Sequence, residues 1–165
     1  MGYNMSTKII TALEKQINLE ISSAYLYLAM SAKMNVANYP GYSSWLFKQY
    51  REEMGHAEDF ISYALRRELD VNFGAIEQPV VATSNPLEIA KLVLEHEKIV
   101  TKSIFELYEL ARNEKDYTTE LFVQKYIEEQ AEEEESAKAI IDKLNFIGES
   151  HVARYALDKE LGARQ

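Results

Sequence analysis

Apolar residues recur at alternating steps of three and four along four long stretches of the chain, the spacing typical of helices that pack against one another. These stretches cover about residues 5–34, 42–69, 86–113 and 117–146, and a shorter one covers 150–161. In each long stretch, polar side chains interrupt the inward-facing apolar strip near its middle. The pattern predicts an all-α protein, a four-helix bundle with a short fifth helix and a polar layer inside its core.

The segments between the helices indicate how the helices are ordered in space. Short turns, the first of which includes Pro40 and Gly41, make the first two helices antiparallel and likewise the third and fourth. The segment 70–85 has no helical period and contains Gly74 and Pro79. It can extend to about 53 Å, and the helix before it is about 43 Å long. We therefore expect one long crossover between a second and a third helix that run in the same direction.

The second helix contains a pair of residues with the spacing of metal ligands. Glu53 and His56 lie three residues apart, so both side chains point to the same side of the helix. Such pairs are common in acidic helices, but this one lies on the inward strip, between Leu46 and Phe60. Burying an unpaired carboxylate is strongly unfavourable, so the fold must supply opposite charges, hydrogen bonds or a metal ion.

The other three long helices carry polar side chains at the same depth. These side chains lie at similar distances from the predicted helix starts, about 11 to 15 residues, so they should meet in one layer. They are Glu20, Glu97, Gln130 and, slightly further along, Glu133. The inward strips contain almost no Lys or Arg, which favours metal ions over ion pairs as the partners of these acids. Two repelling divalent ions are held together by bridging carboxylates, and oxygen-rich ligation with one imidazole suits iron or manganese.

Composition narrows the class of protein. The net charge of −9 argues against nucleic acid or an anionic membrane as a partner and favours cations. The chain has no cysteine, which excludes disulfides and thiolate-ligated zinc or iron. It also has no apolar run of about 18 residues and no pattern of a secretion signal at its start. We expect a single domain over 1–165, located in the cytoplasm, without a membrane partner.

Five blocks of the sequence resemble prokaryotic non-haem ferritins, in the same order and across nearly the whole chain. They are NLEISSAYLY at 18–27, EEMGH at 52–56, EHE at 95–97, EQAEE at 129–133 and LDKEL at 157–161. The resemblance implies a ferroxidase that oxidises Fe(II) with dioxygen or hydrogen peroxide. It also implies a homo-oligomeric cage of about 24 subunits that stores ferric oxyhydroxide, with no haem.

The resemblance also implies which residues hold the iron. Ligands of a dinuclear centre, bridged by Glu53, would be Glu20, Glu53, His56, Glu97 and Glu133, with Gln130 beside them. A third iron position would use Glu52, Glu129 and Glu132. Tyr27 would lie beside the centre as a one-electron donor and hydrogen-bond partner. His96 lies one residue off the inward strip and is not assigned as a ligand.

Two alternatives to a storage ferritin stay open at this point. Met54 occupies the position where bacterioferritins place a haem ligand, although Met is also an ordinary core residue. A dinuclear oxidase or peroxide reductase that stores nothing would use the same ligands. One departure from the family pattern is Lys125, which stands where many relatives have an aromatic residue, so the resemblance does not settle the stoichiometry of oxidation.

Overall fold

The structure, a computed structural model, describes residues 5–164, so residues 1–4 and 165 of the expected domain lie outside the described part. Its helices are α1 (Thr7–Val36), α2 (Pro40–Arg66), α3 (Pro86–Asn113), α4 (Tyr117–Ile147) and α5 (His151–Gly162). The all-α prediction is confirmed. Between residues 5 and 164, no helix has an apolar stretch long enough to cross a membrane.

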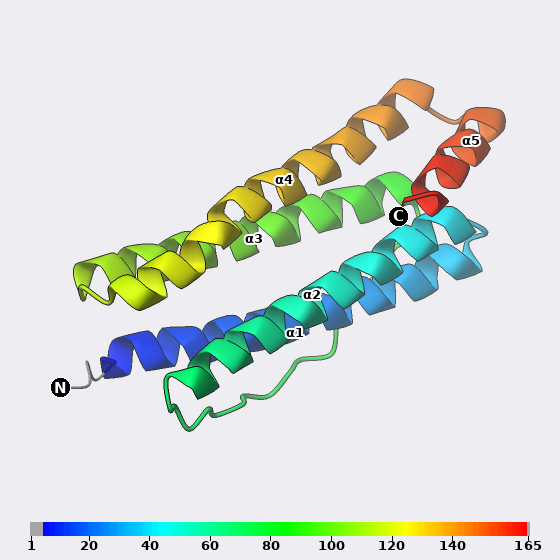
Figure 1. Cartoon of the computed structure of the whole chain (residues 1–165). Helices are drawn as coiled ribbons and strands as arrows, with labels where there is room; N and C mark the ends of the chain where they lie inside the picture. Colours follow the sequence, from blue (N-terminus) through cyan, green and yellow to red (C-terminus); the bar gives the residue numbers. More distant parts are fainter. Residues whose placement is uncertain (1–4, 165) are drawn as a thin grey trace.

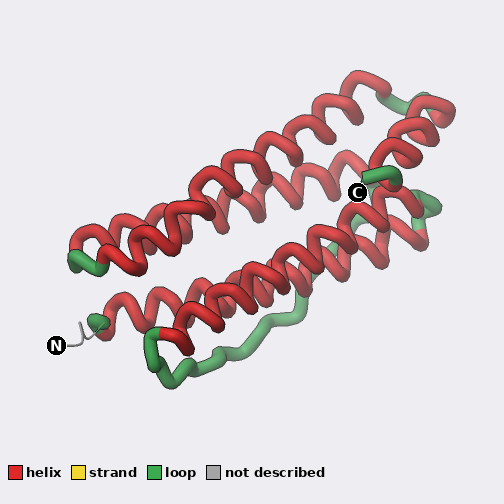
Figure 2. The backbone as a smooth tube through the Cα atoms, viewed as in Figure 1, coloured by secondary structure: helices red, strands yellow, loops and turns green. Residues whose placement is uncertain are grey.

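The four long helices form two antiparallel hairpins that lie against each other. Figure 1 shows α1 with α2 in one hairpin and α3 with α4 in the other, and α2 and α3 run in the same direction. The predicted crossover is present and passes along the outside of the α1 and α2 pair (Figure 2). It is held to α1, because Glu14 accepts a hydrogen bond of 2.9 Å from the backbone of Asn72 and Asn18 accepts one of 3.0 Å from that of Gly74.

Helix ends follow from local chemistry. The Ser6 hydroxyl and the Asn85 side chain accept hydrogen bonds from the first turns of α1 and α3, respectively. Gly148, with a φ of 57°, ends α4 in a conformation that favours glycine. Two expected bounds of α2 were wrong. The helix begins at Pro40 instead of at 42, because proline fits the first helical turn, and it ends at Arg66 instead of at 69.

The hydrophobic core consists of two clusters with the polar layer between them. On α1, Ile17 belongs to one cluster and Tyr27 to the other, and Glu20 lies between them in the sequence. Each of the other long helices likewise has an acid or amide between residues of the two clusters, and the clusters follow in the opposite order on α2 and α3: Leu46, Glu53 and Phe60 on α2; Val93, Glu97 and Val100 on α3; Tyr126, Gln130 and Ala137 on α4. The polar layer therefore crosses the bundle near its middle.

Helix α5 is attached to the start of α2. The Asp158 carboxylate, only 6% exposed, accepts hydrogen bonds from the backbone N–H groups of Gly41 at 3.0 Å and Tyr42 at 2.8 Å. These groups lie in the first turn of α2, where a negative charge is favoured by the helix dipole. The contact requires a glycine, because a Cβ at position 41 would lie 1.7 Å from the backbone oxygen of Asp158.

Replacing this glycine should separate α5 from α2. Gly41→Ala forces the backbone of Asp158 away, and we expect it to lower the free energy of unfolding by about 3 kcal/mol. Gly55→Ala is the matched control on the same helix, since its Cβ would meet nothing within 4 Å, and should raise stability by about 0.5–1 kcal/mol. Denaturant unfolding of both variants tests the prediction. If the two substitutions changed the free energy of unfolding equally, the close packing of Gly41 against Asp158 would be contradicted.

Candidate metal centre

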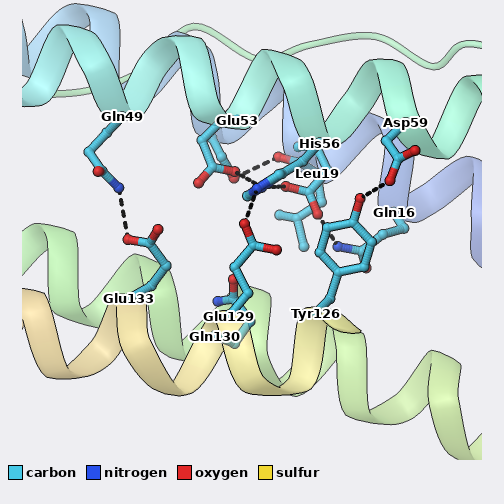
Figure 3. Close-up of polar contacts among 12 residues, drawn as sticks. Gln16, Leu19, Gln49, Glu53, His56, Asp59, Tyr126, Glu129, Gln130 and Glu133 are labelled. Atoms are coloured by element: carbon cyan, nitrogen blue, oxygen red, sulfur yellow. Dashed lines mark hydrogen bonds and ion pairs between the residues drawn. The ribbon is translucent and has the colours of Figure 1, made fainter. Parts of the chain in front are cut away.

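One side chain from each long helix meets in the polar layer. Glu20 on α1, Glu53 on α2 and Gln130 on α4 are 1% exposed, and Glu97 on α3 is fully buried. Figure 3 shows Glu53 and His56 reaching from α2 towards Glu129, Gln130 and Glu133 on α4. The prediction that mid-helix polar groups share one layer therefore matches their placement, and the apolar clusters on both sides keep water away from them.

Glu20, Glu53 and His56 form a group that could hold a metal ion. One ligand atom of each lies within 4.8 Å of the others. The Nδ1 atom of His56 is 3.5 Å from Glu53 Oε2 and 3.8 Å from Glu20 Oε2, too far for strong hydrogen bonds. Both of these buried Oε2 atoms lack a hydrogen-bond partner among the described residues. Two unpartnered carboxylate oxygens facing an imidazole nitrogen suit a divalent cation.

The orientation of the His56 ring is set from α4. Its Nε2 atom donates a hydrogen bond of 2.8 Å to Glu129 (Figure 3), which leaves Nδ1 facing the two carboxylates. A carboxylate behind a ligating histidine is a recurrent feature of metal sites. Burial disfavours the imidazolium, but Glu129, Glu20 and Glu53 outweigh burial and raise the pKa of His56 well above its ordinary value. A cation bound at Nδ1 would need this nitrogen free of its proton, so metal binding would release a proton here.

Glu97 is held by two neighbours. The Tyr27 hydroxyl donates to its Oε1 atom, and the Gln130 amide donates to its Oε2 atom at 3.1 Å. Burial raises the pKa of the Glu97 carboxyl, and burial together with Glu97 raises that of Tyr27 well above its ordinary value. Tyr27, predicted to lie beside the centre, therefore touches a predicted ligand and keeps its proton.

Two further glutamines, which we had not assigned to the site, orient acids of the layer. Gln49, fully buried, donates a hydrogen bond of 2.8 Å to Glu133 (Figure 3), and Gln16 donates one of 2.6 Å to Glu20. Ser103 on α3 in turn donates to the Gln16 oxygen at 2.5 Å. A sequence signal exists, because Gln16 precedes Glu20 by four residues, the distance at which helical side chains meet.

The three acids expected at a third iron position are not gathered in one group among the described residues. Glu129 contacts His56, whereas the Glu52 side chain is 43% exposed and pairs with Arg164 at 3.0 Å. Glu132 is exposed on α4. The three acids therefore have different surroundings: Glu129 contacts His56, Glu52 contacts Arg164 and Glu132 faces solvent.

Two residues close to the centre have structural partners. Lys125 donates to Asp59, and its Nζ atom lies 4.9 Å from the ring centre of Tyr126, which donates a hydrogen bond of 2.6 Å to the same carboxylate. Tyr126 also packs edge-on against the His56 ring at 5.4 Å. His96, left unassigned, bonds to Ser23 at 2.6 Å and does not belong to the ligand group.

Comparisons with known proteins follow the same pattern. The sequence matches the family model of the ferritin-like domain over residues 10–147, which include the whole polar layer. The chain belongs to the ferritin family. It is 35% identical to the bacterial non-heme ferritin of Staphylococcus aureus over 97% of this chain and 96% of that protein. The bacterial non-heme ferritin of Bacteroides fragilis is 34% identical over 97% and 99% of the two chains.

Solved structures show the same fold. The open pore ferritin from the hyperthermophilic archaeon Archaeoglobus fulgidus has a TM-score of 0.95 and is 44% identical to this ferritin over 98% of both chains. A humanized archaeal ferritin has a TM-score of 0.96 at 42% identity, again over 98% of both chains. The predicted resemblance to non-haem ferritins and the predicted fold are both confirmed.

The acid Glu133 should make the stability of the metal-free protein depend on pH. Burial and the neighbouring Glu97 raise its pKa to about 7. Because this pKa is higher in the folded chain than in the unfolded chain, the stabilisation is present at low pH and is lost as the pH rises towards about 7. Glu133→Gln cannot ionise. Its free energy of unfolding relative to wild type should therefore rise by about 2 kcal/mol between pH 5 and pH 8.

Denaturant unfolding at both pH values, with a chelator present, measures this difference. Glu58→Gln, on the exposed side of α2, is the control and should show a difference from wild type that does not change with pH. A pH-independent difference for Glu133→Gln would mean that the folded chain does not hold this carboxyl in its neutral form.

Proposed function

We propose that this ferritin binds Fe(II) in the polar layer, oxidises it, and stores the product as Fe(III) oxyhydroxide inside a hollow homo-oligomeric cage. The observation that carries the proposal is the pair of unpartnered oxygens, Glu20 Oε2 and Glu53 Oε2, which face the Nδ1 atom of His56. Buried carboxylate oxygens without a hydrogen-bond partner are costly, and a cation between them would remove that cost.

In this proposal both hairpins supply ligands. Glu20, Glu53 and His56 hold one iron, and Glu53 bridges to a second iron held by Glu97 and Glu133 with Gln130 close by. Two Fe(II) ions each give one electron to dioxygen, which takes up two protons and leaves as hydrogen peroxide; peroxide as the oxidant would be reduced to water. The protein supplies charge and geometry, and the redox chemistry belongs to the metals.

Storage and assembly are the second part of the proposal. Relatives named ferritin, matched over nearly their full length, support iron storage in an oligomer. We propose a cage of about 24 subunits in the cytoplasm, a dinuclear centre in each subunit and a third iron position at Glu52, Glu129 and Glu132. Closing such a cage needs contacts between chains, for which exposed apolar residues such as Tyr25, Leu65 and Phe73 are available.

The alternatives predict different products. A haem-bearing bacterioferritin would use Met54, which is half-buried, and would show a Soret band after haem is supplied. The similarity to relatives named bacterial non-heme ferritin favours a centre without haem. An oxidase or peroxide reductase that stores nothing would oxidise iron but retain only the ions of its centre.

Iron loading tests the storage function. An excess of Fe(II) is added in air to the metal-free protein, and the soluble product is sized and assayed for iron. We expect iron far beyond about three ions per chain to elute with a particle of many chains. If oxidation is rapid but the iron precipitates, or if only about two ions stay bound per chain, the proposed metal centre is supported and the proposed storage function is wrong.

A matched pair of variants on α2 tests the centre. Glu53→Ala removes the proposed bridging carboxylate, and we expect the initial rate of Fe(II) oxidation to fall at least about 100-fold. Glu58→Ala removes an exposed acid from the same helix and should leave the rate within about twofold. The rate is followed by the absorbance of Fe(III). Wild-type oxidation in Glu53→Ala would show that the polar layer is not the oxidation site.

A further inference from the structure

The segment after α5 places a positively charged side chain, that of Arg164, against α2. Arg164 lies two residues past Gly162, the last residue of α5, and its guanidinium stands 5.2 Å from the ring centre of Trp45. Its Nη2 atom lies 3.0 Å from both carboxylate oxygens of Glu52. Its Nη1 atom donates a hydrogen bond to the side-chain oxygen of Gln49. One cation thus holds an exposed acid and a buried amide at the same time.

Gln49 connects this cation to the metal centre. Its side chain is fully buried, and its Nε2 atom donates a hydrogen bond of 2.8 Å to Glu133 (Figure 3). An amide accepts through its oxygen and donates through its nitrogen, so a donor on the oxygen side fixes which end faces Glu133. Arg164 therefore orients a predicted ligand of the second iron without touching it.

The contact between Arg164 and Glu52 also involves a predicted metal ligand. In the proposed function, this acid is a ligand of the third iron, yet in the structure both of its oxygens face Arg164. A guanidinium and a divalent cation repel each other at such distances, and Glu52 cannot serve both fully. Glu129 and Glu132, the other two acids of that position, are not part of the Arg164 contact.

We propose that Arg164 is a built-in competitor for the third iron: it occupies Glu52 while that position is empty and leaves it when a cation binds there. The inference rests on the proposed third iron position. When Arg164 leaves, Gln49 loses the hydrogen bond to its oxygen. Its amide is then less firmly oriented, so binding of a cation at the third position also affects the hydrogen bond from Gln49 to Glu133. Arg164 is accordingly a positioning residue whose removal changes the affinity of the third position most, with a smaller effect on the second iron through Gln49 and Glu133.

Anaerobic calorimetric titration with Co(II), a divalent probe that is not oxidised under these conditions, tests this competition. Wild type is compared with Arg164→Gln, which removes the charge, and Arg164→Lys, which keeps it. We expect Arg164→Gln to bind the third ion about threefold to tenfold more tightly, with the ion held by Glu20, Glu53 and His56 unchanged and a smaller change in the second ion. Arg164→Lys keeps the charge but loses the planar group that reaches both Glu52 and Gln49, so its affinity for the third ion should lie between those of wild type and Arg164→Gln. Lys91→Gln removes an exposed charge that pairs with Glu88 on α3, and should change nothing.

A double-mutant cycle with Glu52→Gln separates competition from a merely structural role. If Arg164 acts through Glu52, then Arg164→Gln has no effect on binding of the third ion in the Glu52→Gln background. An unchanged or weaker third ion in Arg164→Gln, at an unchanged melting temperature, would overturn the proposal. An equal increase in affinity for the third ion in the wild-type and Glu52→Gln backgrounds would also overturn it.

The same titration shows whether the proposed centre itself fails. Glu53→Ala should lose the first, tightest ions whatever Arg164 does. If wild type binds two ions that depend on Glu53 but Arg164→Gln leaves the third unchanged, only the competition is wrong. If wild type binds no ion that depends on Glu53, the proposed centre is wrong, and the competition fails with it.

Discussion

Three carboxylates, those of Glu20, Glu53 and Glu97, lie in the middle of this bundle with at most 1% of their surface exposed, and no Lys or Arg is among the buried residues of the described chain. Burial raises the pKa of Glu53 well above its ordinary value, and the nearby imidazole of His56, 3.5 Å away, only partly offsets this. Such a layer weakens the apolar core that it divides in two. The long helices on both sides must therefore supply enough apolar contact to hold it in place.

Uncharged hydrogen-bond donors orient the buried acids without cancelling their negative charge. Gln16, Gln49 and Gln130 each donate a hydrogen bond to a different acid, and the Tyr27 hydroxyl donates another. A lysine in any of these places would have formed an ion pair and left less negative charge for a metal. The amides fix the direction of the carboxylates and keep the layer attractive to cations, and the single imidazole lies where its Nδ1 atom can be shared.

Much of this arrangement could be predicted from periodicity. The step of three and four placed Glu53 and His56 inside the bundle, and equal depth along each helix placed Glu20, Glu97 and Gln130 beside them. Interactions without a local signal were missed. Asp158 meets Tyr42 across 116 residues and Arg164 meets Gln49 across 115, and no helical spacing relates such pairs. The start of α2 was misplaced because proline followed by glycine is read equally well as a turn or as a first helical turn.

The division of the ligands between the two hairpins has a consequence for how the chain folds. Glu20, Glu53 and His56 all belong to the α1 and α2 hairpin, whose contacts are local, whereas Glu97, Gln130 and Glu133 belong to α3 and α4. Local hairpins form quickly, and docking them through the crossover requires closing a longer loop. The acids stay hydrated until that docking and lose their water together when it occurs. A divalent cation bound by the first hairpin before docking would reduce the desolvation penalty of this last step.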